Sequence, residues 1–181
     1  MSFSRILLLF CLMACMFSAQ AQRRNSRYND YIRQYAPLAV EQMKRYKIPA
    51  SITLSQGLLE SGAGMSELAR KSNNHFGIKC HSNWRGRRVY HDDDARGECF
   101  RAYGHPRDSY EDHSLFLRQG QRYAFLFNLK ITDYRGWAKG LKKAGYATDP
   151  SYANRLITII EDYELYKYDS QGLGKRAARQ W

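Results

Sequence analysis

The stretch SQGLLESGAGMSELARKSNNHFGIK, residues 55–79, places Glu60 where an apolar segment gives way to small residues. Two leucines precede Glu60, and Ser-Gly-Ala-Gly follows it. Proline fits the first turn of a helix, and glycine commonly ends one. The pattern therefore predicts a buried helix that opens at Pro49, ends at Gly62 and Gly64, and carries one carboxylate at its C-terminal end.

The position of Glu60 predicts that its pKa is raised. Apolar surroundings and the negative end of a helix dipole both disfavour the charged form of a carboxyl group and raise its pKa. A carboxyl that keeps its proton near neutral pH can donate it to the leaving oxygen of a glycoside. The small residues after Glu60 would leave room for a bulky substrate. The alternative is an ordinary solvated glutamate at a helix end.

Residues 1–21 are typical of a signal peptide: Arg5 precedes an apolar run at 6–17, and an A-x-A pattern ends at Ala21. The run is too short to span a bilayer. We therefore expect export to the periplasm, the cell surface or the extracellular medium, with cleavage after Ala21 and no transmembrane segment. Lipidation at Cys15 is a competing interpretation, but the apolar stretch continues past this cysteine.

The formal net charge of +12 narrows the choice of partners. Basic proteins bind nucleic acid, anionic membranes or anionic wall polymers, and export argues against nucleic acid. The length predicts one domain, which we place at residues 29–168. We expect it to be a monomer, preceded by a mobile segment at 22–28 and followed by a disordered basic tail at 169–181.

Capping residues and prolines predict an α+β fold that is mainly helical. Helix starts are indicated at Asn29 or Asp30, Pro37, Pro49, Ser66, Asp108 (with Glu111 in a capping box), Thr132 or Asp133, and Asp149-Pro150. Between them, a turn at residues 84–86 and β-rich segments at 89–90 and 99–103 predict one small antiparallel hairpin.

Cys80 and Cys99 lie near the two bases of this hairpin. In an oxidising compartment, such a pair is more typical of a disulfide than of a metal or redox site. In the chain-entropy account, a bridge closing a loop of this size stabilises the fold by about 3 kcal/mol. His75 and His113 have no metal-ligand spacing with their neighbours, so we expect no metal and no cofactor.

Four segments occur in order along the chain: ESGAGMS at 60–66, NNHFGIK at 73–79, CFRAY at 99–103 and GYATDP at 145–150. Together they resemble glycoside hydrolase family 73, the endo-β-N-acetylglucosaminidases of bacterial cell walls, over roughly residues 31–166. The resemblance implies a lysozyme-like fold and cleavage of the β-1,4 bond between N-acetylglucosamine and N-acetylmuramic acid in peptidoglycan. Glu60 matches the catalytic acid of the family, and Tyr146 matches a tyrosine of its cleft.

The second carboxylate departs from the family pattern, in which many members hold a glutamate on a longer hairpin. This hairpin offers the run His91-Asp-Asp-Asp94, with Glu98 nearer its base. We favour Asp93 or Asp94 as the base that activates water in an inverting reaction, whose carboxyl groups lie about 6.5–9.5 Å apart. A substrate-assisted mechanism would need no second carboxylate.

Several polar and aromatic residues are candidates for binding sugar. Asn73 and Asn74 would hydrogen-bond hydroxyl or N-acetyl groups, or else form a turn. Candidate stacking platforms are Phe76, Trp84, Tyr103 and Tyr152, although with 14% aromatic residues most must be core.

The sequence is also compatible with two other functions. A non-catalytic peptidoglycan-binding module is suggested by the missing hairpin glutamate. A cell-wall amidase is disfavoured, because such enzymes need zinc ligands or a cysteine nucleophile.

Overall fold

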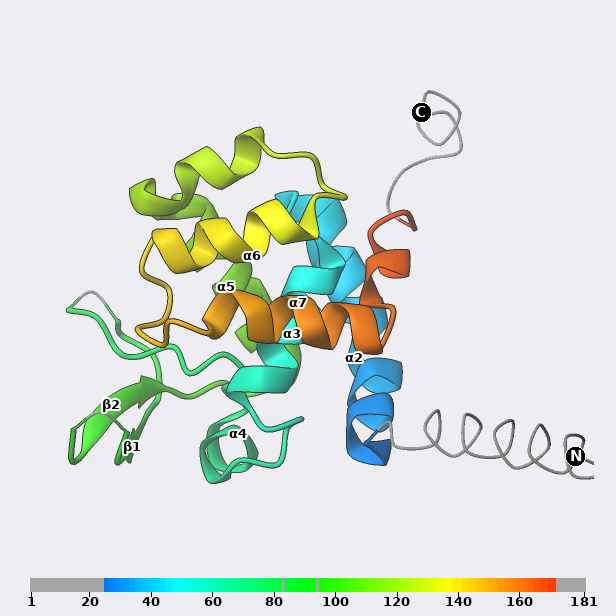
Figure 1. The fold of residues 1–181 in the computed structure, drawn as a ribbon. Helices are drawn as coiled ribbons and strands as arrows, with labels where there is room; N and C mark the ends of the chain where they lie inside the picture. Colours follow the sequence, from blue (N-terminus) through cyan, green and yellow to red (C-terminus); the bar gives the residue numbers. More distant parts are fainter. Residues whose placement is uncertain (1–24, 83, 94, 172–181) are drawn as a thin grey trace, which may run out of the picture.

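The computed structural model describes residues 25–82, 84–93 and 95–171 (Figure 1). The predicted signal peptide, Cys15 and Asp94 therefore lie outside the described residues, as does the tail from residue 172. In the described part of the chain, no helix is both long enough and apolar enough to cross a bilayer.

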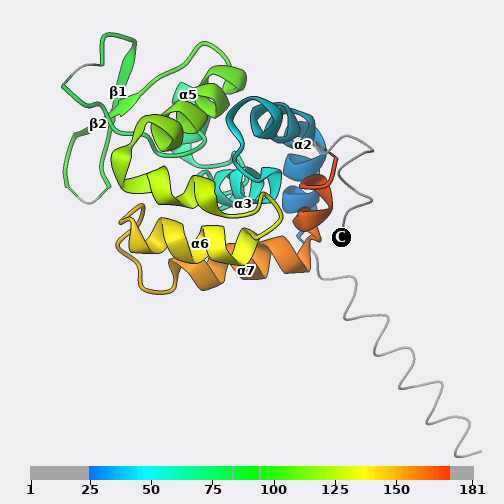
Figure 2. The ribbon, with the colours of Figure 1, turned by 90° about the horizontal axis from the view of Figure 1, so that it is seen from above.

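The chain is mainly helical with one two-stranded antiparallel sheet, which confirms the predicted α+β class. Its elements are α2 (Ser26–Tyr46), α3 (Ala50–Glu60), α4 (Glu67–Ser72), β1 (Arg88–His91), β2 (Glu98–Arg101), α5 (Pro106–Gln119), η1 (Gln121–Asn128), α6 (Tyr134–Lys143), α7 (Tyr152–Asp162) and η2 (Leu165–Tyr168). Helices α6 and α7 lie side by side (Figures 1 and 2), while the hairpin of β1 and β2 stands apart from them and contacts α4.

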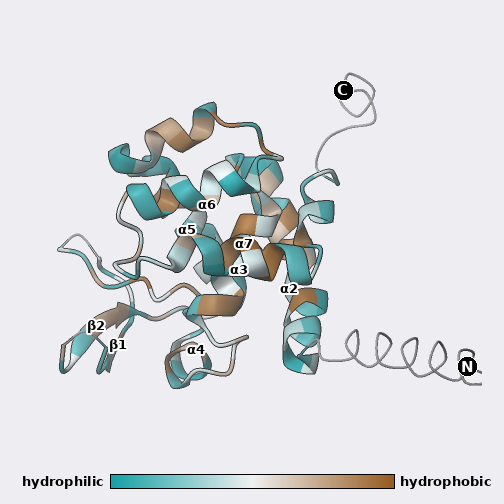
Figure 3. Cartoon of the chain, in the orientation of Figure 1, coloured by the Kyte–Doolittle hydropathy of each residue, from teal (hydrophilic) through white to brown (hydrophobic). Residues whose placement is uncertain are grey.

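Helix α3 is the centre of the fold. Every residue from 50 to 58 is buried, and α2, α6, α7 and η2 all pack against this helix. Apolar residues gather in α3 and α7, while hydrophilic residues dominate much of α2 (Figure 3). Because α3 is buried on all sides, its polar side chains must find partners inside the protein. Only its last turn, which ends at Glu60, reaches an open surface.

Helix α2 differs from the prediction at both its start and its middle. It begins at Ser26, where Asn25 accepts a hydrogen bond from the Arg27 amide, so part of the segment predicted as mobile is helical. It then continues through Pro37, and the predicted helix start at this proline is wrong. Pro37 lies on the exposed face. The carbonyl of Arg33, which loses its intrahelical bond to the proline, can therefore bond to water.

Helix α5 also begins earlier than predicted. Its cap is His105, whose side chain accepts from the Arg107 amide, while Asp108 accepts from the His105 amide. Asp108 is therefore the second partner of a capping box and not its first residue. The predicted partner Glu111 instead binds Arg45 and Tyr46 of α2.

The C-terminal boundary predicted at residue 168 leaves out a residue of the core. Asp169 is buried, and its carboxylate accepts from the backbone N and the Oγ of Ser51 at 2.8 and 2.7 Å. These bonds cap the start of α3, where Pro49 offers no side-chain cap. The first residue of the predicted tail thus completes the central helix.

The hairpin forms where it was predicted. Val89 pairs with Phe100, and Lys79 bridges the other edge of Phe100. Cys80 and Cys99 form a disulfide that fastens the segment entering the hairpin to β2. The strand predicted at 99–103 ends at Arg101.

Candidate active site

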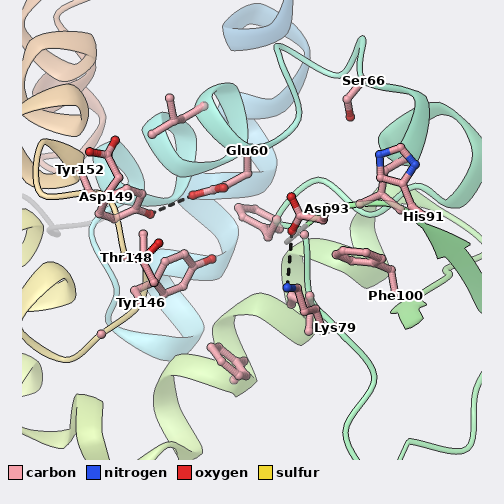
Figure 4. A pocket seen from close by; sticks show the side chains of 18 of the residues that line it. Glu60, Ser66, Lys79, His91, Asp93, Phe100, Tyr146, Thr148, Asp149 and Tyr152 are labelled. Carbon is pink, nitrogen blue, oxygen red and sulfur yellow. Dashed lines mark hydrogen bonds and ion pairs between the residues drawn. The ribbon is translucent and has the colours of Figure 1, made fainter. Parts of the chain in front are cut away.

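A cleft of about 570 Å³ lies between the helical part of the molecule and the hairpin (Figure 4). Glu60 stands on its helical side with Tyr146 and Tyr152, and Asp93 and Lys79 stand on its hairpin side. The lining is completed by Leu59, Ser66, Leu68, Phe76, Gly77, Ile78, His81, His91, Phe100, Phe116, Gly145, Ala147, Thr148, Asp149 and Arg155.

The local sequence explains how Glu60 reaches this cleft. After Glu60 the chain turns through Gly62, Ala63 and Gly64, all of which have positive φ angles of 56°, 59° and 76°. Glycine adopts this left-handed conformation at little cost, so the turn ends α3 abruptly. The Ser61 hydroxyl locks the turn by donating to the Gly57 carbonyl and accepting from the Gly64 amide.

The surroundings of Glu60 raise its pKa to about 7. Desolvation by the packed protein is the main cause, although solvent still reaches the carboxyl through the open cleft. The hydrogen bond from the Tyr152 hydroxyl, at 3.1 Å, and the charge of Arg155 oppose the rise, whereas the negative charge of Asp93 adds to it. A large fraction of the Glu60 side chains would therefore carry a proton at neutral pH.

Two tyrosines form the wall beside Glu60. The rings of Tyr146 and Tyr152 stack with centroids 5.7 Å apart. Burial raises the pKa of both phenols well above the usual value of 10. Both hydroxyl groups therefore remain hydrogen-bond donors over the pH range in which proteins function.

The hairpin side of the cleft is held by ion pairs. The Lys79 ammonium lies 3.5 Å from the Asp93 carboxylate and 2.8 Å from that of Glu98. Asp92 is occupied differently, because it accepts from the Gly97 amide. Of these three carboxylates, only that of Asp93 lines the cleft.

The structure brings Glu60, Asp93, Phe76, Tyr146 and Tyr152 together in the cleft, as predicted for site residues. The predicted residues Asn73, Asn74, Trp84 and Tyr103 do not line the cleft, and Asp94 lies outside the described residues.

The asparagine pair has its amide groups bound to backbone. Asn73 ends α4 in the left-handed conformation and donates to the carbonyls of Tyr103 and Gly104. Asn74 is buried and donates to the carbonyls of Ile78 and Arg101. Neither asparagine lines the cleft, and both instead fix the base of the hairpin.

Trp84 and Tyr103 likewise support the hairpin. The guanidinium of Arg101 lies 4.6 Å from the Trp84 ring centroid, and the Tyr103 hydroxyl donates to Asp112 at 2.5 Å. Neither aromatic ring lines the cleft.

Some cleft residues were missed by the sequence interpretation, among them Arg155, Lys79 and His91. Arg155 follows Tyr152 by three positions, which places both on one face of α7. The spacing would have indicated Arg155 once Tyr152 was chosen. Within residues 25–82, 84–93 and 95–171, no group of three or more His, Cys, Asp or Glu side chains is arranged to hold a metal ion.

Comparisons with known proteins agree with this geometry. Residues 36–165 match the family model described as mannosyl-glycoprotein endo-beta-N-acetylglucosaminidase. The chain is 37% identical over 137 residues to the exo-glucosaminidase LytG of Bacillus subtilis, covering 70% of this chain and 48% of LytG. It is 30% identical over 146 residues to the peptidoglycan hydrolase FlgJ of Vibrio parahaemolyticus, covering 75% of this chain and 47% of FlgJ. The chain thus spans about half the length of these curated relatives.

A solved structure shows the same fold. The peptidoglycan hydrolase from Sphingomonas sp. A1 is 30% identical, with a TM-score of 0.67 over 81% of this chain and 96% of that one. The fold is therefore the lysozyme-like α+β fold that the sequence predicted. The family match covers most of the chain and includes the whole helical wall around Glu60, so the chain belongs to the glucosaminidases of glycoside hydrolase family 73.

Proposed function

We propose that this protein hydrolyses the β-1,4 bond between N-acetylglucosamine and N-acetylmuramic acid in peptidoglycan, with Glu60 as the general acid. The observation that carries the proposal is a carboxyl group with a pKa of about 7 facing an open cleft of about 570 Å³. The relatives named exo-glucosaminidase and peptidoglycan hydrolase support the choice of substrate.

In the proposed reaction, the Glu60 carboxyl donates its proton to the oxygen that leaves the sugar. The hydrogen bond from Tyr152 and the charge of Arg155 then stabilise the Glu60 carboxylate that results. A pKa near the working pH suits this task, because the acid is protonated before the step and ionised readily during it.

Asp93 is the proposed base. It lies on the side of the cleft across from the Tyr152 wall, and the ammonium of Lys79 holds its carboxylate there (Figure 4). A water molecule between Asp93 and the sugar would lose its proton to this carboxylate as it attacks. This arrangement corresponds to inversion at the sugar carbon. The phenol of Tyr146 would donate to the N-acetyl group or a sugar hydroxyl.

We further propose that the protein acts outside the cytoplasm. The signal-peptide pattern at 1–21 and the Cys80–Cys99 disulfide support export, because such bonds persist in oxidising compartments. The basic charge suits an anionic wall. Mass spectrometry of the exported chain tests this: a start at Gln22 supports cleavage after Ala21, and a lipid-modified Cys15 at the new N-terminus would replace it by membrane anchoring.

The reaction itself is tested by digesting purified peptidoglycan and identifying the new ends by mass spectrometry. Reducing N-acetylglucosamine ends are expected from the wild type, and almost none from Glu60→Gln. Glu67→Gln is the matched control, because Glu67 is exposed, pairs with Lys71 and does not line the cleft.

Other products would overturn the proposal in distinct ways. Reducing N-acetylmuramic acid ends would indicate a muramidase, and anhydro ends a lytic transglycosylase. Released peptides would indicate an amidase. Binding to peptidoglycan without any new end would indicate a non-catalytic module.

A further inference from the structure

Two buried polar side chains behind Glu60 have no part in the reaction described above. Gln56, on α3, and His113, on α5, are both fully buried, and neither lines the cleft. A buried polar group destabilises a protein unless it is hydrogen-bonded, so the partners of these two residues need an explanation.

Their hydrogen bonds form a chain that ends on Glu60. His113 Nε2 lies 3.2 Å from Gln56 Oε1, and Gln56 Nε2 donates to the Tyr152 hydroxyl at 2.9 Å. The same hydroxyl donates to Glu60 Oε1 at 3.1 Å. The chain crosses from α5 through α3 to α7, and returns to the end of α3.

The chain has one favoured direction. Burial lowers the pKa of His113 to about 3, so its ring is neutral and carries a single N–H. With this proton on Nε2, His113 donates to Gln56 Oε1, the Gln56 amide donates to the Tyr152 oxygen, and the Tyr152 proton is left for Glu60. With the proton on Nδ1, the amide would turn over and the Tyr152 hydroxyl would donate to Gln56 instead.

The surroundings of His113 disfavour this reversed direction. Its Nδ1 atom is buried and has no hydrogen-bond partner among the described residues. The ring stacks on Phe76 at a centroid distance of 3.9 Å and meets the edge of Tyr146. In the reversed direction, His113 Nδ1 would carry a buried N–H without an acceptor. In the favoured direction, Nδ1 carries only an unpaired lone pair. Buried N–H groups without a partner are the rarer case.

We propose that His113 and Gln56 are positioning residues, which direct the Tyr152 hydroxyl to donate to Glu60 through this one-way chain. The catalytic consequence rests on the proposed function, but the chain itself does not. A hydrogen bond donated to a carboxylate favours its charged form. The hydrogen-bonded chain would therefore limit the rise in the pKa of Glu60 that desolvation causes.

Other groups also face Glu60, and the substitutions must leave them in place. They are Tyr152 and Arg155 from α7, Tyr146 and Asp149 from the α6–α7 connection, Asp93 and His91 from the hairpin, and Lys79 and His81 from the segment before it. The side chain of Gln56 hydrogen-bonds only to Tyr152 and His113 among the described residues. Replacing Gln56 thus removes the hydrogen bond donated to the Tyr152 oxygen without removing a charged group near Glu60.

The test is a carbon-13 NMR titration of the Glu60 carboxyl in the substrate-free protein. Tyr152→Phe should raise the midpoint by about one pH unit, because it removes the donor. His113→Leu should shift the midpoint in the same direction, because the freed Gln56 amide can turn over and accept the Tyr152 proton. Gln56→Leu should shift it by a smaller amount, because it removes the donor to the Tyr152 oxygen but leaves no competing acceptor. His113→Gln, whose amide can donate in place of Nε2, should restore part of the difference. Leu117→Val is the control: it loosens α5 one turn further along, at a buried residue that does not line the cleft.

The proposal is overturned if Gln56→Leu and His113→Leu leave the midpoint at its wild-type value, or if Leu117→Val moves it equally. Should the leucine variants not fold, nitrogen-15 NMR of His113 in the wild type decides. A proton on Nε2 supports the chain, and a proton on Nδ1 contradicts it.

The outcome separates this proposal from the proposed function. A midpoint shift in a protein that does not cleave peptidoglycan would support the chain and contradict the function. In a protein that does cleave it, the basic limb of the pH profile of kcat/KM should move upward in Gln56→Leu and His113→Leu. An unmoved limb would contradict the chain and leave the function intact.

Discussion

The two sides of the cleft are built from different interactions. On the helical side, buried hydrogen bonds and stacked rings hold Glu60 against Tyr152 and Tyr146. On the hairpin side, a partly exposed ion pair with Lys79 holds the carboxylate of Asp93. Salt and competing charges weaken exposed ion pairs far more than buried contacts. Packing therefore sets the protonation of Glu60, the proposed acid, whereas a partly exposed ion pair positions Asp93, the proposed base.

The largest expected effect comes from removing the carboxylate of Asp93 on the hairpin side of the cleft. Asp93→Asn should lower the rate of peptidoglycan hydrolysis by about 10²–10⁴-fold, because an amide cannot take a proton from water. Thermal stability should change little, since Asp93 is half-exposed. Asp94→Asn, made alongside, separates the neighbouring carboxylates. Loss in Asp94→Asn alone would move the base by one residue, and full activity in both variants would favour a substrate-assisted reaction.

The next largest effect should come from removing the Cys80–Cys99 disulfide, which fastens the hairpin. Replacing Cys80 and Cys99 by serine frees a loop whose ends are 19 residues apart and should cost about 3 kcal/mol of unfolding free energy. For a chain of this size, the loss corresponds to a fall in Tm of about 6–12 °C. Calorimetry measures this fall, and hydrogen exchange should show the hairpin amides opening before those of α3. Equal exchange in the two regions would contradict a difference in how they are held.

The support beneath the hairpin can be weakened at Asn74. Asn74→Ala removes two amide bonds to backbone carbonyls and the acceptor of the Ile78 amide, and should cost about 2 kcal/mol. Chemical denaturation measures the change. Asn74→Asp keeps the acceptor but loses both donors, so it should recover little of the stability. A fully stable Asn74→Ala protein with impaired sugar binding would return Asn74 to the role first predicted for it.

The smallest effect concerns the stability of the helical side. The pKa of Glu60 is raised from 4.5 to about 7, so the folded state binds more protons than the unfolded state between these values. Stability from this group is complete below pH 4.5 and is lost as the pH rises through 7. Glu60→Gln should thus match the wild type at pH 4.5 and exceed it above pH 7, by at most about 1 kcal/mol because the cleft is open.

Denaturation curves at pH 4.5, 6 and 8 would show this trend. Glu67→Gln is again the control, because its pair with Lys71 lowers the pKa of Glu67, and no such gain is expected there. A stability difference between Glu60→Gln and the wild type that does not depend on pH would show that packing does not perturb Glu60.

Local signals in the sequence predicted much of the fold. The start of α3 after Pro49, its end before the glycines and the position of the hairpin all depend on residues close together in the chain. The errors arose where distant residues decide. Asp169 caps α3 from 118 positions away, and Pro37 is tolerated in α2 because tertiary packing leaves that face open to water. Neither fact can be derived from neighbouring residues.

The candidate site shows the same limit. Glu60 and Tyr146 were found through motifs, and the structure places both in the cleft. The asparagines at 73–74 carry the same motif signal, yet their amides bind backbone around the hairpin base. Gln56 lies one helical turn before Glu60, so its spacing could have indicated it. Its partner His113 is 57 positions away, and only the tertiary fold brings the two side chains together.

The proposed reaction depends on packing that keeps a proton on Glu60 near neutral pH. The carbon-13 shift of the Glu60 carboxyl, followed in the wild-type protein from pH 3 to 10 with Glu60→Gln to assign the signal, measures this property. The midpoint is expected near 7. A midpoint near 4.5, the ordinary value for a glutamate, would contradict it.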